Sequence, residues 1–548
     1  MLRSRNQLLR ARTSQRKLGA YYTSSDAAGA MARWVLANGA RTVLEPSFGD
    51  GVFLRAVAAE GDARVYGAEL NAAPFAAAVA AGLLRRDDAH GGDFLAWHPP
   101  PIDAVIGNPP YVRLRHLPVD QQARALEVAA AAIPEGMQSS GSVWMAFVLH
   151  AANALRVGGR MALVLPFELT HVRYARPLWG WLGGAFGALR VVRVRERLFP
   201  DLLQDVVVLF AADRGGTTAI VEFEALDTAE AFARAAPRDA TAAPNGETVR
   251  VFIEALLAGE RGFMEALLPG HVRDALAALV PLTVPVRELC AFNIGYVSAD
   301  KVFFHPDAAT CARFSLAASS LVPALTSSRQ VQRLRTSTTA SETELDRRLF
   351  MPLAAPNAEL SAADAAYVAH GESLGVHQRY KCRTREPWFR VPDVRVPDVV
   401  LSVFSERPVL AINDAGYVAT NSLLCGFLKG LQGGTATATA DALVAAWYTS
   451  LTVLGLELQV HALGGGVMVV VPGEAGKVRV ARVAAIPDGH IERLAAALAA
   501  GDVAGAYGLG DDAILRGVLG VSAETVAAVQ EGVRVLARWR DRREPAAL

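Results

Sequence analysis

Four consecutive residues, Asn108, Pro109, Pro110 and Tyr111, have the groups needed to hold an aromatic amine for alkylation. The lone pair of such an amine is delocalised into its ring, so the nitrogen is a poor nucleophile. The side-chain oxygen of Asn108 and the carbonyl of Pro109 can each accept one N–H hydrogen bond and so direct the lone pair at an electrophilic carbon. Proline fixes φ and has no N–H, which holds its carbonyl rigidly. Tyr111 offers a ring on which a base can stack. The tetrapeptide therefore predicts a centre for methyl transfer to an amine.

The position of this tetrapeptide strengthens the prediction. Proline makes up about 5% of average sequences, so a chance match in a chain of this length is on the order of one in a thousand. Residues 103–107 before it form an apolar stretch that predicts a strand. Ligands of α/β proteins bind beside the carboxyl ends of strands, where we expect Asn108.

A second motif, Glu45-Pro46-Ser47-Phe48-Gly49-Asp50-Gly51, follows the predicted strand 42–44 and precedes a predicted helix. The glycines at 49 and 51 let the backbone come close to a ligand. The helix start behind them offers free N–H groups to a carboxylate. Only two glycines are present, so this is not the dinucleotide motif. A purely structural turn is an equally good interpretation of this motif by itself.

Two acids further along are candidates for contacts with an adenosyl group. Glu69 ends the predicted strand 65–68, about 20 residues after the glycine turn, where a carboxylate can accept both ribose hydroxyls. Asp93 can bind the amino group of an adenine, and Phe94 can stack on its ring. Taken singly, these residues could equally be a helix cap, a turn aspartate and a core phenylalanine.

The elements that must position these residues follow an alternating pattern. Short apolar stretches at 42–44, 65–68, 102–107, 160–165 and 206–211 alternate with helical stretches. This predicts a parallel sheet covered by helices on both faces, a Rossmann-like α/β fold. After Arg214-Gly215-Gly216 the pattern changes to helical and then mixed segments. We predict a catalytic domain over residues 1–225, a mixed α/β recognition region over 226–485 and a helical segment over 486–548.

Composition limits the class of protein. The chain has 548 residues, 52% of them hydrophobic and 20% charged, with a net charge of +1, which argues against a histone-like binder. Residues 451–472 are the most apolar stretch but contain Glu457, His461 and a glycine triplet, which predicts two strands and a turn. Four cysteines without a CxxC pair indicate a reducing compartment and no zinc framework, so we expect no metal, no membrane and a cytoplasmic location.

Basic residues nevertheless gather in two places. Residues 1–17 contain six Arg or Lys and no acid, and residues 377–396 contain six against two acids. Such patches suit phosphate contacts, although a solvated tail and loop would have the same composition.

The order of these motifs resembles the gamma-class amino-methyltransferases, in particular TaqI-like N6-adenine DNA methyltransferases of restriction–modification type. The resemblance implies a class I methyltransferase fold and S-adenosylmethionine as cofactor. It assigns Tyr22 and Thr23 to the segment that closes over the methionine end, with Ser24 replacing the usual proline. It also places Phe199 against the flipped base, opposite Tyr111. The cofactor contacts it implies are Tyr22, Thr23, Glu45, Pro46, Ser47, Gly49, Gly51, Glu69, Asp93, Phe94 and Asn108.

The second half resembles the DNA-recognition region of that family through looser patterns. They are Asn293-Ile294-Gly295-Tyr296-Val297, His370-Gly371-Glu372, Arg379-Tyr380-Lys381-Cys382-Arg383, Arg385-Glu386-Pro387-Trp388-Phe389 and Ala419-Thr420-Asn421-Ser422. Lys381, Arg383 and Arg385 suit phosphates or guanine edges, and Trp388 suits packing beneath them. The spacing does not identify which arginine contacts a base.

These observations predict a site-specific adenine-N6 DNA methyltransferase that flips its target base. The expected partner is double-stranded DNA, with a nucleoid-associated location. Only 17 residues precede the first motif, so we expect no nuclease domain, but either a separately encoded endonuclease or a solitary modification enzyme. A monomer is compatible with the sequence. Two alternatives remain: the same site acting on cytosine N4, RNA or a protein amide, and a catalytically silent DNA-binding subunit.

Overall fold

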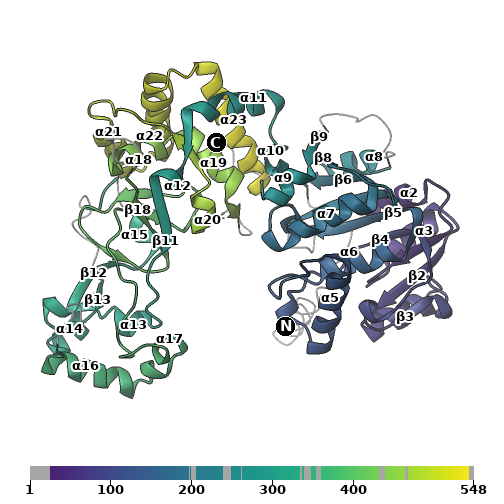
Figure 1. Ribbon diagram of the computed structural model, residues 1–548, viewed down its shortest axis with the longest axis horizontal. Coiled ribbons are helices and arrows are strands. Elements are labelled where there is room, and N and C mark those ends of the chain that lie inside the picture. Colours follow the sequence, from purple (N-terminus) through teal and green to yellow (C-terminus); the bar gives the residue numbers. More distant parts are fainter. Residues whose placement is uncertain are drawn as a thin grey trace, which may run out of the picture. The chain divides into compact units, whose positions relative to one another are not determined.

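The computed structural model describes residues 25–196, 198, 205–237, 248–260, 262–333, 336–338, 347–352, 359–430, 439–462 and 467–541. The chain divides into two compact units, Met1–Leu267 and Leu268–Leu548, and each is described by itself (Figure 1). No helix in these described ranges is long and apolar enough to cross a membrane.

In the described part of the first unit, one sheet has the strand order β3-β2-β1-β4-β5-β7-β6-β8-β9. Its strands are β1 (Thr42–Glu45), β2 (Arg64–Glu69), β3 (Ala89–Gly91), β4 (Ile102–Gly107), β5 (Leu155–Pro166), β6 (Phe186–Val194), β7 (Val206–Arg214), β8 (Ile220–Leu226) and β9 (Val249–Phe252). Strand β7 is antiparallel to β5 and β6, and β9 to β8, whereas the other neighbours are parallel. The chain order reverses between β1 and β4, which creates the crevice where ligands of such sheets bind. The predicted Rossmann-like class I fold is confirmed.

Helices cover both faces of this sheet (Figure 1). They are α2 (Ser25–Leu36), α3 (Val52–Glu60), α4 (Ala72–Ala80), α5 (Val119–Ala132), α6 (Trp144–Asn153), α7 (Arg176–Ala185), α8 (Ala229–Ala235), α9 (Ile253–Ala258) and α10 (Gly262–Glu265), with short 3₁₀ turns η1 (Arg86–Asp88), η2 (Phe94–Ala96), η3 (Leu114–His116), η4 (Phe167–Thr170) and η5 (Arg173–Ala175). Alternate residues of β4 and β5, such as Ile106 and Val164, pack with α2, α3 and α8 in one buried cluster. Side chains of successive strand residues point to opposite faces, so Val105 and Leu163 face the other layer, where α6 is almost wholly buried.

The sheet continues beyond residue 225, where the sequence pattern places the end of the first domain. Strand β8 ends at Leu226, and β9 returns antiparallel to it, with Val221 opposite Val251. The first compact unit therefore ends at Leu267, because β9 and the helices behind it complete the far edge of the sheet.

The second unit contains small sheets in the orders β10-β21, β11-β18-β14-β16, β13-β12-β17 and β15-β20-β19. The strands are β10 (Thr283–Pro285), β11 (Cys290–Ile294), β12 (Leu321–Leu325), β13 (Arg348–Phe350), β14 (Val399–Ser402), β15 (Phe404–Ser405), β16 (Leu410–Ile412), β17 (Val418–Ala419), β18 (Leu423–Leu428), β19 (His461–Ala462), β20 (Met468–Val469) and β21 (Arg479–Ala481). The helices are α11 (Gly270–Leu279), α12 (Val286–Leu289), α13 (Lys301–Phe304), α14 (Ala308–Phe314), α15 (Ser328–Arg333), α16 (Ala362–Ser373), α17 (Tyr380–Arg383), α18 (Ala440–Trp447), α19 (Ser450–Gln459), α20 (Pro472–Ala475), α21 (His490–Ala499), α22 (Val503–Gly510) and α23 (Ala523–Arg540), with η6 (Val280–Leu282), η7 (Ala318–Ser320), η8 (Val376–Gln378) and the π-helix η9 (Asp511–Val518). This mixed composition agrees with the expected α/β recognition region.

The start of the apolar stretch 451–472 is helical, so the prediction of two strands and a turn is wrong over residues 451–459. Helix α19 is almost entirely buried, and its Glu457 accepts hydrogen bonds from Arg540 of α23 at 3.0–3.1 Å. Glycine at 532 lets α23 approach closely, because a Cβ there would lie 3.0 Å from Leu454. Helix α23 is therefore part of the second unit's core.

Candidate active site

The motif residues of the first unit gather at the carboxyl ends of β1, β2 and β4. Glu45 ends β1, Glu69 ends the neighbouring β2, and Asn108 directly follows β4, which pairs with the other side of β1. The Ser47 hydroxyl donates a hydrogen bond to the backbone carbonyl of Asn108 at 3.1 Å. The glycine turn and the tetrapeptide are thus in direct contact, as the sequence predicts.

The glycine turn adopts a backbone that other residues rarely tolerate. Gly49 and Gly51 have φ values of 50° and 77°, in the left-handed region that favours glycine. The N–H of Gly49 donates to Oε2 of Glu69 at 2.9 Å. Oε1 of Glu69 accepts from both the backbone and side-chain nitrogens of Asn71, at 2.7 and 2.9 Å. The carboxylate that we expect to bind ribose therefore also fixes the turn.

Glu45 is the most unusual carboxyl of the site. It is 1% exposed, and its Oε2 atom has no hydrogen-bond partner among the described residues. Burial, with the nearby charges of Asp50 and Glu69, raises the pKa of Glu45 well above its ordinary value. A buried acceptor without a partner costs free energy unless a ligand satisfies it. The site therefore fits a ligand that brings a cation or N–H donors to the end of β1.

The tetrapeptide is braced from the neighbouring strand β5. The Tyr111 hydroxyl lies 2.6 Å from Oδ1 of Asn108 and 2.9 Å from the Val164 carbonyl oxygen. One hydroxyl proton serves one strong bond at a time, so the two acceptors share it. The Tyr111 ring is half-buried against the sheet's hydrophobic core. In this arrangement Tyr111 holds the Asn108 amide in place, in addition to the stacking role that the sequence predicts.

Asp93 and Phe94 lie where the sequence predicts, but with partners that it does not reveal. Asp93 caps the turn η2 by accepting from the Leu95 N–H at 3.0 Å, and its Oδ2 accepts from Arg124 of α5 at 2.8 Å. Arg124 also donates to Asp120, four residues earlier, at 2.7 Å. Phe94 is 2% exposed, so its ring belongs to the core beneath the site and is not a free stacking face.

A second cluster holds the segment that follows the tetrapeptide. Glu168, after β5, accepts from Arg113 at 2.8 Å and from the Tyr174 hydroxyl at 2.6 Å. Burial, with the nearby charge of Glu168, raises the pKa of Tyr174, so that this hydroxyl stays a proton donor. The sequence does not reveal this cluster, because Arg113 lies 55 positions from Glu168. Tyr22, Thr23 and Phe199 lie outside the described residues, so their assignments stay predictions.

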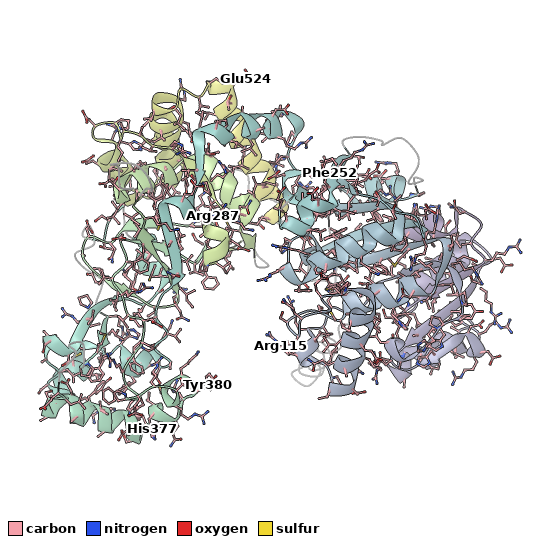
Figure 2. All side chains as sticks on the ribbon, viewed as in Figure 1. Arg115, Phe252, Arg287, His377, Tyr380 and Glu524 are labelled. Carbon is pink, nitrogen blue, oxygen red and sulfur yellow. The ribbon has the colours of Figure 1, made fainter. Side chains whose placement is uncertain are left out.

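In the second unit, the basic segment is partly structural. Lys381 and Arg383 of α17 are exposed, and Lys381 lies 5.7 Å from the ring of Tyr380, which is 69% exposed (Figure 2). Arg385, by contrast, is half-buried and donates to the Val297 and Ser298 carbonyls at 2.5 and 3.2 Å. Its guanidinium is thus committed to the fold, which corrects the expectation that it is available for DNA.

Trp388 packs among aromatic side chains of the second unit. Its ring lies 5.3 Å from that of Phe303, and its N–H donates to Glu372 at 3.1 Å. Gly371 is required there, since a Cβ would lie 2.4 Å from Phe303 and 2.8 Å from Trp388. The pattern His370-Gly371-Glu372 is therefore explained by packing.

The segments 293–297 and 419–422 of the second unit pair through backbone hydrogen bonds. The Tyr296 N–H donates to the Ala419 carbonyl at 3.0 Å, and the Asn421 N–H donates to the Tyr296 carbonyl at 2.9 Å. A Cβ on Gly295 would lie 2.2 Å from the Ala419 oxygen. Backbone pairing explains the glycine, and the side chain of Asn293 is exposed.

Residues 7–170 match the family described as N-6 DNA Methylase, and residues 260–515 match the C-terminal domain of the type II methyltransferase M.Eco57I. Type II methyltransferase M.AccI of Acinetobacter calcoaceticus is 22% identical over 434 residues, which are 75% of this chain and 76% of M.AccI. The chain is an N6-adenine DNA methyltransferase. This methyltransferase is of the restriction–modification type and uses S-adenosylmethionine, as the motifs predict, and the alternative acceptors are not favoured.

Among solved structures, the methyltransferase resembles the type IIG restriction endonuclease BpuSI, with a TM-score of 0.44 and 14% identity over 95% of this chain. It also resembles the protein of the DrdV–DNA complex, with a TM-score of 0.43 and 12% identity over 79% of this chain. The chain spans 66% of BpuSI and 52% of DrdV.

Proposed function

We propose that Asn108 and the Pro109 carbonyl are the acceptor pair of this methyltransferase, that the amine they hold is adenine N6, and that Tyr111 positions Asn108 for this task. The observation that carries the proposal is the hydrogen bond between Ser47 of the glycine turn and the Asn108 backbone, at 3.1 Å. It joins the cofactor loop directly to the residue that would hold the acceptor nitrogen.

The cofactor would lie along the carboxyl ends of β1 and β2. Glu45 supplies a buried acceptor for the ammonium of the methionine end, and Glu69 keeps lone pairs for the ribose hydroxyls while it holds Gly49. Asp93, oriented by Arg124, would accept from the adenine amino group. S-adenosylmethionine supplies a methyl group on positively charged sulfur, so the N–C bond forms as the C–S bond breaks and one amine proton is released.

The chain's own contribution is positioning and electrostatics. The Asn108 oxygen and Pro109 carbonyl accept the two N–H bonds of the amine and stabilise the positive charge that develops on nitrogen. The Asn108 side-chain oxygen has two lone pairs, so it can accept an N–H of the arriving amine while the Tyr111 hydroxyl beside it keeps the amide in place. The site is therefore pre-organised before the base arrives.

The target adenine would have to leave its duplex to reach this site, at a cost of a few kcal/mol. Stacking on Tyr111, and on Phe199 outside the described residues, would offset that cost. Lys381 and Arg383 of the second unit would contact phosphates, because both are exposed on one short helix. We propose that the enzyme acts on double-stranded DNA in the cytoplasm, at the nucleoid, as the modification partner of a separately encoded endonuclease or as a solitary enzyme.

The Asn108→Ala variant tests the acceptor assignment. It removes the side-chain acceptor but leaves the backbone carbonyl that bonds Ser47, so cofactor affinity measured by calorimetry should stay within about 2-fold of wild type. Transfer of labelled methyl to DNA should fall by about 100-fold or more, the size seen when one such electrostatic contact is removed. Ser47→Ala is the matched control: it weakens the link to the loop without removing the acceptor, so activity should persist at a reduced level. Near-wild-type transfer by Asn108→Ala would refute the assignment.

A further inference from the structure

A pocket opens at the edge of the sheet β11-β18-β14-β16 in the second unit. It is a small depression open to solvent, lined by Asn293, Ile294, Gly295, Tyr296, Asp393, Arg395, Ala419, Cys425 and Phe427. Three of these side chains, Asn293, Asp393 and Arg395, are polar and exposed.

The sheet register places the polar group of Asn293 beside an apolar floor. Strands β11 and β18 are antiparallel, with Asn293 opposite Cys425 and Ala291 opposite Phe427. Residues opposite each other in such a pair share a face of the sheet, as do residues two apart on one strand. Asn293, Cys425 and Phe427 therefore share one face, and Asn293 lies on the outermost strand, β11.

Arg395 comes to the same place from the loop before β14. Its guanidinium carbon lies 4.6 Å from the centre of the Phe427 ring, a cation–π contact that restrains the side chain while leaving its donors exposed. Asp393, two residues earlier, has a φ of 57°, so the chain turns sharply here and keeps a carboxylate at the pocket.

The mixture of groups selects the ligand. A phosphate site would favour several cations and exclude a carboxylate, whereas this pocket combines a cation, an anion and an amide that both donates and accepts. That mixture matches the edges of base pairs in the major groove, where arginine pairs with O6 and N7 of guanine and asparagine with N6 and N7 of adenine. The exposed Lys381 and Arg383 belong to the same unit and provide the phosphate contacts that such a reading site needs.

We propose that this pocket reads bases of the recognition sequence in duplex DNA, with Arg395 recognising a guanine and Asn293 a neighbouring base pair. This inference rests on the proposed role of the second unit in DNA binding. It goes further because it separates residues that specify sequence from residues that only hold phosphates.

The test uses the full-length chain expressed in a host without adenine methylation, with the methylated sites mapped by sequencing. Arg395→Ala and Arg395→Lys should both relax the methylated motif at one guanine position. Discrimination at that position should fall by about 5- to 150-fold, which corresponds to about 1–3 kcal/mol. Asn293→Ala should relax a different position. Arg534→Ala, an exposed arginine on α23, is the charge-matched control and should leave the motif unchanged.

Other outcomes would count against the inference or against the proposed function. If the Arg395 variants methylate the same motif more weakly, with a smaller salt dependence, the pocket binds phosphate and the inference is overturned. An unchanged motif at an unchanged rate would overturn it as well. Absence of methylation by the wild-type chain would instead count against the proposed function. Variants that still bind S-adenosylmethionine and melt like wild type are folded, so loss of activity in them would be informative.

Discussion

Replacing Glu45 with glutamine should make the empty enzyme more stable and its cofactor complex weaker. Within the part of the chain that the structure describes, Oε2 of Glu45 is buried without a partner, and burial with neighbouring acids raises the pKa of this carboxyl. An unsatisfied buried polar atom costs about 1–3 kcal/mol, and Glu45→Gln removes the charge that makes that cost largest. At about 2–4 °C per kcal/mol for a domain of this size, the melting temperature of the first unit should rise by several degrees.

The direction of the pKa shift of Glu45 determines how the stability difference between Glu45→Gln and wild type changes with pH. The folded state raises the pKa of Glu45. The favourable contribution of this carboxyl to the free energy of unfolding is therefore fully present below the ordinary pKa of 4.5, and it is lost as pH rises through the folded pKa. The stability advantage of Glu45→Gln over wild type should therefore be small near pH 4.5 and grow toward neutral pH. Differential scanning calorimetry without cofactor measures this directly.

Addition of S-adenosylmethionine should reverse the order of the melting temperatures of wild type and Glu45→Gln. A ligand at 100 times its Kd stabilises by about 2.7 kcal/mol, and the variant should lose most of that gain because the buried charge no longer meets the ammonium. Glu69→Gln is the matched control, since Glu69 accepts bonds from Gly49 and Asn71, so its loss should destabilise the empty enzyme. The reasoning is refuted if Glu45→Gln melts below wild type without cofactor, or gains as much from S-adenosylmethionine as wild type does.

Three further variants test neighbouring contacts. Tyr111→Phe removes the hydroxyl that Asn108 and Val164 share. Single-turnover assays should show a transfer rate about 5-fold lower, which is equivalent to one neutral hydrogen bond, with unchanged cofactor affinity. An unaltered rate would exclude the positioning role. Arg124→Gln frees Asp93, so calorimetry should show cofactor affinity about 2- to 5-fold weaker with DNA affinity unchanged, and the reverse pattern would contradict the assignment. Lys381→Ala should reduce the slope of log K for DNA against log salt by about 1 for every sequence tested, and sequence-dependent losses would argue against a phosphate contact.

The part of the site that the sequence predicts is the part carried by contiguous motifs at strand ends. Strands β1, β2 and β4 are short and apolar, so the positions of Glu45, Glu69 and Asn108 follow from where each strand stops. Arg124 and Glu168 could not be found this way, because each joins the site through contacts with residues more than 30 positions distant. Their segments contain no motif of their own.

Elements with buried charges were also hard to predict. Strand β6 contains Arg190, which is 2% exposed and donates to the carbonyls of Ala235 and Ala236. Because a charged residue interrupts its apolar residues, the sequence of β6 does not predict a core strand. Helix α19 contains Glu457, buried against Arg540 in the same way. Arg385 shows the converse error, since a basic segment indicates DNA contact although this guanidinium is bound to backbone carbonyls. In each case the charged side chain is buried or half-buried because it binds a partner far away in the sequence, and the local sequence does not reveal that partner.

The central claim is that the Asn-Pro acceptor pair directs a methyl group to adenine N6. Duplex DNA treated with the purified chain and isotopically labelled S-adenosylmethionine, then digested to nucleosides and analysed by mass spectrometry, tests it most directly. The account predicts label in N6-methyldeoxyadenosine for wild type, and label lower by about 100-fold or more for Asn108→Ala with cofactor affinity retained. Label in N4-methyldeoxycytidine, or undiminished N6 labelling by Asn108→Ala, would contradict it.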